Sequence, residues 1–182
     1  MAAIHTLRTA LLGAALLAAG ACGYTLRQSA PLPQALGSVA IQAVNRDSVL
    51  VMDLERELES AGASLRPVGS VGVSTLRIDS ETMERNVVSL DSRAKVGEYE
   101  LNYRVTYAVD DADGKPLVPT TPLALSRTYS FDEQQAIGAG QEEDLIRTEL
   151  RHEVVRIIME RLQRVQDPNR ARESRTSNEY GD

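Results

Sequence analysis

EYELNYRVTYAVD, residues 98–110, carries the clearest periodicity in this 182-residue chain. Tyrosines and aliphatic residues take alternate positions from Tyr99 to Val109, and the positions between them are mostly charged or polar. A period of two predicts a long β-strand with one buried face and one wet face. We interpret the tyrosines as core residues of this strand, and a ligand-stacking surface is the alternative.

A hairpin is predicted after this strand. Asp113-Gly114 is a turn signal between two extended runs. The second run begins with three prolines, which is typical of an edge strand, and then alternates again. Its prolines are Pro116, Pro119 and Pro122, and its alternating apolar residues are Leu123, Leu125, Tyr129 and Phe131.

Another strand is predicted before residue 91. It starts with Leu76 and Ile78, continues through a polar stretch and closes with Val87 and Val88, so we expect one strand with a bulge. The connection from Asp91 to Lys95 then forms the tip between two strands, with Arg93 and Lys95 side by side. We interpret it either as a solvated turn or as a site for anionic lipid or phosphate.

Two helices complete the pattern. Asp47 or Ser48 can cap a first helix with apolar residues at helical spacing, and Gly62 supplies its stop. A second helix is expected after Gly138 and Gly140, with acidic residues near its positive end and one apolar stripe. The acidic residues are Glu142, Glu143 and Asp144, and the stripe runs through Ile146, Leu150, Val154, Ile157, Ile158, Leu162 and Val165.

The order of elements predicts an α/β (α+β) two-layer sandwich. A short strand at Val39 and Ile41 precedes the first helix, so the order is strand, helix, three strands, helix. Each helix has one apolar stripe that must be covered. We therefore expect two helices packed on one face of a four-stranded mixed, mostly antiparallel sheet.

No constellation of catalytic residues stands out. His152 is the only histidine after residue 21 and lies within the last predicted helix, where a solvated side chain is the simpler interpretation. One histidine and one cysteine give a zinc site almost no ligands, so neither a metal nor a cofactor is expected. The chain carries a net charge of −6, which gives no support to a nucleic-acid partner.

The N-terminus predicts export and lipid attachment. About ten apolar residues end in Gly20 and Ala21, whereas a membrane span takes roughly 20, so residues 1–21 are interpreted as a signal peptide. Cys22 follows and is the only cysteine, which predicts lipidation of its sulfur; a free thiol is the alternative. We expect a lipidated leader at 22–36, one domain at 37–166 and a polar, disordered tail at 167–182.

Several fragments in this order resemble the LPS-assembly lipoprotein (LptE) family of Gram-negative bacteria. They are CGYTLR at 22–27, Leu32-Pro33, GEYEL at 97–101, RTYSFD at 127–132, Gly138, and Glu142-Glu143. Residues 19–22 also resemble a lipobox, and Gly23 in place of aspartate resembles lipoproteins that are delivered to the outer membrane.

The resemblance implies a non-enzymatic, palmitate-bearing lipoprotein on the periplasmic side of the outer membrane. Its partners would be an LptD-type β-barrel, which it plugs and helps to assemble, and lipopolysaccharide (LPS), which it binds through basic loop residues. Arg93 and Lys95 are the candidate LPS-binding residues. An accessory subunit of another envelope transport or maintenance machine is the alternative, and a small envelope hydrolase is the third.

Overall fold

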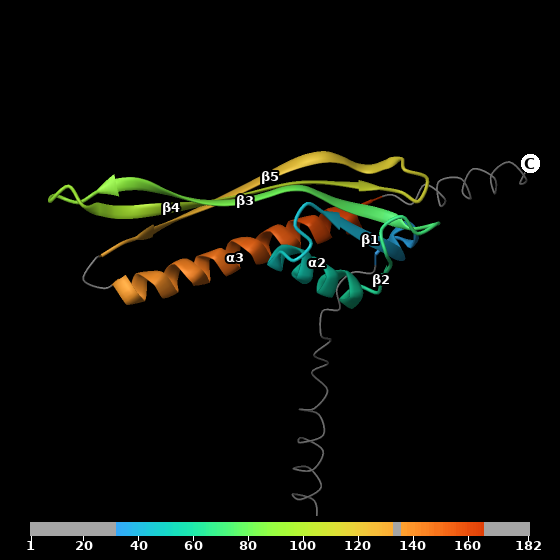
Figure 1. The fold of residues 1–182 in the computed structure, drawn as a ribbon, viewed down its shortest axis with the longest axis horizontal. Helices are drawn as coiled ribbons and strands as arrows, with labels where there is room; N and C mark the ends of the chain where they lie inside the picture. The colour runs from blue at the N-terminus through green and yellow to red at the C-terminus, as the bar shows by residue number, and fades with distance from the viewer. Residues whose placement is uncertain (1–31, 133–135, 166–182) are drawn as a thin grey trace, which may run out of the picture.

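The computed structural model describes residues 32–132 and 136–165. The elements follow one another as a 3-10 helix η1 (Gln34–Leu36), β1 (Ser38–Ala43), α2 (Val49–Ser60), β2 (Ser64–Leu65), β3 (Ser74–Leu90), β4 (Val96–Asp110), β5 (Pro116–Ser130) and α3 (Ala136–Gln163). The strands form one sheet in the order β2-β1-β3-β4-β5, and both helices cover the same face of it (Figure 1). The predicted two-layer α+β fold is confirmed.

The sheet has five strands in the described residues, so the predicted number of four was wrong. The additional strand, β2, consists of Ser64 and Leu65 and pairs in parallel with the start of β1. Gly62, with φ +90°, ends α2 and turns the chain back into this pairing. Two residues are too few to show an alternating pattern, which explains why the sequence did not indicate this strand.

The pairing is parallel around β1 and antiparallel elsewhere, as predicted. β1 runs parallel to β3, which the crossover through α2 permits, and β3, β4 and β5 form an antiparallel meander. β3 contains two bulged regions, after Ile78 and after Val87. The edge position of β5 fits its three prolines.

The core lies between the helices and the period-two face of β4. Tyr103 is 1% exposed and Leu101 is fully buried, so the tyrosine face is a core face rather than a ligand-stacking surface. Leu36 is also fully buried and belongs to this core. The other core residues of β4 and α3 are Val105, Tyr107, Val109, Leu150, Val154, Val155, Ile158, Met159 and Leu162.

The predicted start of α2 agrees with the structure, and the predicted start of α3 does not. The Ser48 hydroxyl accepts a hydrogen bond from the Val51 N–H and caps α2, as predicted. α3 begins at Ala136, so Gly138 and Gly140 lie inside it rather than before it. Glycine costs a helix about 1 kcal/mol without forbidding it, so these two residues do not delay the start of α3.

Candidate functional site

The β3–β4 hairpin ends in a five-residue turn from Asp91 to Lys95, beyond the N-terminal end of α3 (Figure 1). Asp91 organises this turn, because its Oδ1 accepts hydrogen bonds from the backbone N–H of Arg93 at 2.8 Å and of Lys95 at 3.0 Å. These backbone hydrogen bonds are the main reason that the pKa of Asp91 is lowered. We call this turn, together with the last residues of β3, the hairpin tip (residues 87–95).

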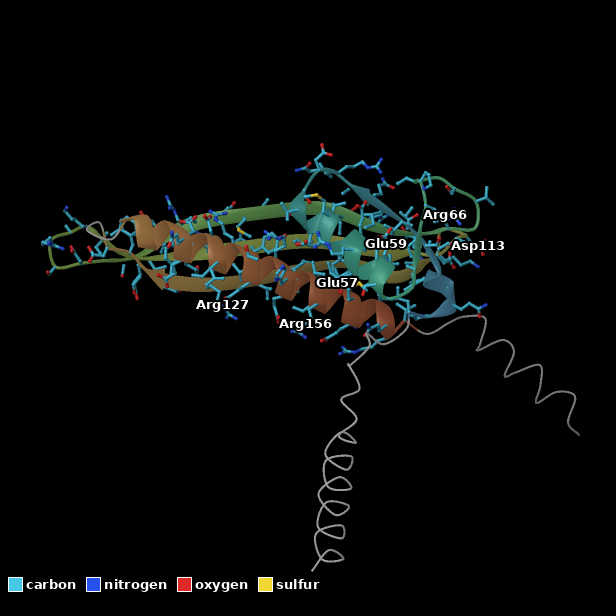
Figure 2. The ribbon with its side chains drawn as sticks, turned by 90° about the horizontal axis from the view of Figure 1, so that it is seen from below. Glu57, Glu59, Arg66, Asp113, Arg127 and Arg156 are labelled. Carbon is cyan, nitrogen blue, oxygen red and sulfur yellow. The ribbon has the colours of Figure 1, made fainter. Side chains whose placement is uncertain are left out.

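The β4–β5 turn repeats the same hydrogen-bonding design with a different charge. Asp111 Oδ1 accepts from the N–H of Asp113 at 2.9 Å and of Lys115 at 2.8 Å. Asp113 therefore stands where Arg93 stands in the other turn. The first turn has one acidic and two basic residues, and the second has two acidic residues and one basic residue. Asp113 lies at the other end of the sheet (Figure 2), so the two ends differ in charge.

The structure places both predicted site residues in one turn. Arg93 is 66% exposed and forms an ion pair with Asp91, whose Oδ2 accepts from Arg93 Nε at 3.1 Å and from Nη2 at 3.0 Å. Lys95 is exposed. The sequence placed the two cations correctly at the tip between two strands, but it did not predict the ion pair with Asp91.

Large apolar side chains lie exposed next to these cations. Val87 is 53%, Val88 54% and Leu90 61% exposed. The sequence pattern indicated Val87 and Val88 only as the end of a strand. The available signal was the position of a Val-Val-Ser-Leu run directly before a charged turn. The hairpin tip thus combines exposed apolar surface with two basic residues.

Glu143 of α3 holds this hairpin against the helical layer. Its Oε2 accepts from the Tyr129 hydroxyl at 2.5 Å and from Arg85 Nη1 at 2.9 Å, and its Oε1 accepts from Arg147 Nη2 at 2.6 Å. The Arg85 guanidinium also lies 4.5 Å from the centre of the Tyr99 ring. Glu143 therefore connects β3, β5 and α3 behind the hairpin tip.

The same contacts determine how these groups titrate. Burial, the largest influence, raises the pKa of the Glu143 carboxyl, but the hydrogen bonds from Tyr129, Arg147 and Arg85 outweigh it and lower the pKa to about 2. Burial, followed by the bond to Glu143, raises the pKa of Tyr129 to about 12. The predicted role of Glu143 at the helix start was wrong, since no acidic residue lies in the first turn of α3.

Within the described residues, no group of three or more His, Cys, Asp or Glu side chains is placed to bind a metal ion. No helix in this part of the chain is long and apolar enough to cross a membrane. His152 is exposed on α3. Cys22, the predicted lipidation site, and the tail after residue 166 lie outside the described residues.

Comparison with known proteins identifies the family. The model of the family described as "LptE: Lipopolysaccharide-assembly" matches residues 36–162, most of this chain. The chain belongs to the LptE family. It is 24% identical over 158 residues to the LPS-assembly lipoprotein LptE of Photorhabdus laumondii, covering 87% of this chain and 86% of that protein. It is 23% identical to LptE of Pectobacterium atrosepticum, covering 87% and 85%.

Solved structures share the fold of this LptE-family chain. The solution structure of an uncharacterised lipoprotein B from Nitrosomonas europaea has a TM-score of 0.64 and 26% identity, over 75% of this chain and 88% of that one. The crystal structure of rare lipoprotein B from Shewanella oneidensis has a TM-score of 0.59 and 22% identity, over 68% and 91%. The family gives this protein a role in LPS assembly, as a lipoprotein and not as an enzyme.

Proposed function

We propose that this protein binds LPS at the hairpin tip while it plugs, and helps to assemble, an LptD-type barrel in the outer membrane. The observation that carries the LPS-binding part is the combination of exposed Val87, Val88 and Leu90 with Arg93 and Lys95. The barrel part rests on membership of the LptE family.

The chemistry of the hairpin tip matches an amphipathic anion. LPS carries phosphate groups beside acyl chains, so a binding surface needs cations next to apolar side chains. A guanidinium forms bidentate hydrogen bonds with phosphate as well as with carboxylate, so Arg93 can exchange its Asp91 partner for a phosphate. Valine and leucine side chains beside it supply contacts for an acyl chain.

The rest of the surface suits a position inside a polar barrel lumen. The sheet face away from the helices carries Ser, Thr, Asn and charged side chains, with Arg104 paired to Glu84 at 3.0 Å. The outer side of the helical layer is also charged; Arg156 of α3 pairs with Glu153 and Glu160 (Figure 2). Both layers therefore present hydrophilic surfaces, as a plug in a water-filled lumen requires.

A lipid on Cys22 would hold this domain at the membrane. Several acyl chains give stable membrane binding at about 0.8 kcal/mol per buried methylene, so the folded domain itself need not bind the bilayer. We propose the periplasmic side of the outer membrane as its location, because Gly23 stands after Cys22 where lipoproteins kept in the inner membrane usually have aspartate. Cys22→Ser is expected to abolish incorporation of labelled palmitate.

Capture of LPS by the purified protein tests the binding site. Arg93→Asp combined with Lys95→Asp should weaken capture of LPS at least tenfold, because both changes place negative charge beside the phosphates. Lys115→Asp combined with Arg66→Asp, near Asp113 at the other end of the molecule (Figure 2), changes the net charge by the same amount; it is the control and should leave capture unchanged. Equal capture by all three proteins would remove the hairpin tip from the proposal.

Co-purification tests the barrel partner. The full-length protein, extracted in mild detergent, should bring down a barrel of LptD type, and the Cys22→Ser protein should retain it because the folded domain carries the interface. Depletion of the protein should also produce misassembled barrel and a defect in surface LPS. If a different envelope complex co-purifies and the barrel assembles normally, the accessory-subunit alternative holds instead.

A further inference from the structure

β3 extends far beyond the strand that covers its outer edge. β1 pairs with β3 only from Val39↔Ser74 to Ala43↔Ile78, whereas β3 continues to Leu90. From Ser80 onward β3 pairs with β4 alone among the described strands. We call the outer side of residues 80–90 the free β3 edge.

The direction of the backbone groups on this edge follows from the neighbouring strands. Gly97 of β4 accepts a hydrogen bond from the Phe131 N–H at 2.9 Å, on the side of β5. Backbone groups alternate between the two sides of a strand, so the odd-numbered residues of β4 from 97 to 107 face β5 and the even-numbered ones face β3.

The partners of those even-numbered residues are also even on β3. Thr82 lies opposite Arg104, and Glu84 lies opposite Asn102. The odd-numbered residues of β3 therefore direct their N–H and C=O groups away from β4, toward the free β3 edge. These residues are Glu81, Met83, Arg85 and Val87.

A hollow lies where β1 ends and the free β3 edge begins. It has a volume of about 390 Å³ and a mixed lining: Val44, Ile78 and Met83 contribute apolar side chains, and Asn45, Ser48, Asp79, Ser80 and Glu81 contribute polar ones. Val44 is 85% exposed. A strand added in line with β1 would bring its own side chains over this hollow, where Val44, Ile78 and Met83 offer apolar contacts.

We propose that the free β3 edge receives an extended segment of the barrel partner, which would pair with residues 81–87 in the position that β1 occupies further along β3. This inference rests on the proposed barrel partner. Strand addition to a sheet edge supplies backbone hydrogen bonds, with pockets for alternate side chains. The hollow beside Val44 is such a pocket at the start of this edge.

The size of the edge favours this occupant over a second copy of the chain. The edge comprises the residues from Ser80 to Leu90, whereas a stable interface takes roughly 20–30 residues a side. Such a contact is stable only when the same partner also binds elsewhere, as a surrounding barrel would. The tail at 167–182 has no Val, Leu, Ile or Met to place against Val44, Ile78 and Met83 in the hollow.

The other long edge of the sheet contrasts with this one. By the same alternation, even-numbered residues of β5 direct their backbone groups outward, and Pro122 among them has no N–H to donate. No proline interrupts the free β3 edge. Strand addition is therefore better accommodated at β3 than at the first half of β5.

Residue-resolved amide hydrogen exchange on the full-length protein, free and bound to its barrel, tests the inference. In the free protein the amides of Thr82 and Glu84 should exchange slowly, because β4 accepts from them, and those of Met83 and Arg85 should exchange fast. In the complex Met83 and Arg85 should slow at least tenfold, while Thr82 and Glu84 serve as internal controls.

Three results would contradict strand addition, and each has a different meaning. Fast exchange of Met83 and Arg85 in an intact complex would overturn strand addition and leave the barrel partner in place. Slow exchange of both amides already in the free protein would show that the chain itself or a second copy occupies the edge. If no complex forms with the barrel, both this inference and the barrel part of the proposed function fail.

Discussion

Ala94 is the residue at which the hairpin tip departs most from ordinary backbone geometry. Its φ is +59°, the only positive value for a non-glycine residue in the described part of the chain. The matching position in the other turn is Gly114, with φ +78°. An L-residue in this region costs about 1–2 kcal/mol relative to glycine, so alanine is unfavourable here.

We predict that Ala94→Gly raises the free energy of unfolding by about 1 kcal/mol, since it relieves this strain. Gly114→Ala should lower it by a similar amount, because open space surrounds the added Cβ and only the backbone cost remains. Urea unfolding of the three proteins checks both values. The free energy of unfolding should rise in Ala94→Gly and fall in Gly114→Ala. A change in the same direction in both variants would contradict the positive φ at these positions.

Glu143 gives the protein a stability that depends on pH. Its pKa is about 2 in the folded protein and 4.5 in an ordinary environment, so the folded state favours the ionised carboxylate. This stabilisation is therefore complete above about pH 4.5 and is lost as the pH falls toward 2. Glu143→Gln should lower the free energy of unfolding by about 1–3 kcal/mol at pH 7 and flatten its decline below pH 4.5.

The neighbouring carboxylate is the control for this prediction. Glu142 is exposed, and Glu142→Gln should leave stability at pH 7 within about 0.5 kcal/mol of the native protein. Thermal unfolding from pH 2 to pH 7 measures all three proteins. An unchanged acid transition in Glu143→Gln would mean that another group controls acid unfolding.

At the scale of elements, one ion pair connects the two helices. Asp53 of α2 is 8% exposed, and its Oδ2 accepts from Arg151 Nε of α3 at 2.9 Å. Asp53→Ala leaves Arg151 without this partner and should destabilise the fold by about 2 kcal/mol. Arg56→Ala is the control, because Arg56 also pairs with Asp53 but its side chain is 73% exposed; it should cost less than about 0.5 kcal/mol.

Urea unfolding distinguishes these two variants. Equal loss of stability from Asp53→Ala and Arg56→Ala would contradict the assignment of the stabilising contact to the helix–helix pair. The double variant Asp53→Ala, Arg151→Ala should be more stable than the sum of the single variants predicts, since it removes both mostly buried charges of the pair and leaves only the exposed Arg56 without its partner.

Local sequence patterns predicted most of the helices and strands, because these elements form from residues that are close in the sequence. The alternation in β4 and the Ser48 cap of α2 each require only a few adjacent residues. β2 depends on pairing with β1 and carries no pattern of its own. The start of α3 was also beyond local reasoning, because two glycines suggested a later beginning than Ala136.

The candidate site was predictable in position but not in composition. Arg93 and Lys95 lie between two strand patterns, which located them at a tip. The ion pair of Arg93 with Asp91 depends on the turn conformation, and the exposure of Leu90 depends on where the helical layer ends. Neither is encoded in residue spacing. The free β3 edge is likewise a consequence of strand order, which single-sequence patterns leave open.

At the scale of the whole molecule, the long sheet has two different ends. One end presents the hairpin tip with two cations and exposed apolar side chains, and the other presents the more acidic Asp111–Lys115 turn (Figures 1 and 2). The chain has a net charge of −6, so a cationic apolar tip contrasts with the overall charge. This polarity predicts that an anionic lipid contacts one end of the molecule and not the other.

Site-specific photocrosslinking in cells tests this claim most directly. Ser92 and Ala112 are exposed and occupy equivalent positions in the two turns, so a photoreactive residue at each site samples the two ends with matched geometry. We predict that LPS crosslinks to position 92 and not to position 112. Crosslinking at position 112 alone, or equally at both positions, would contradict it.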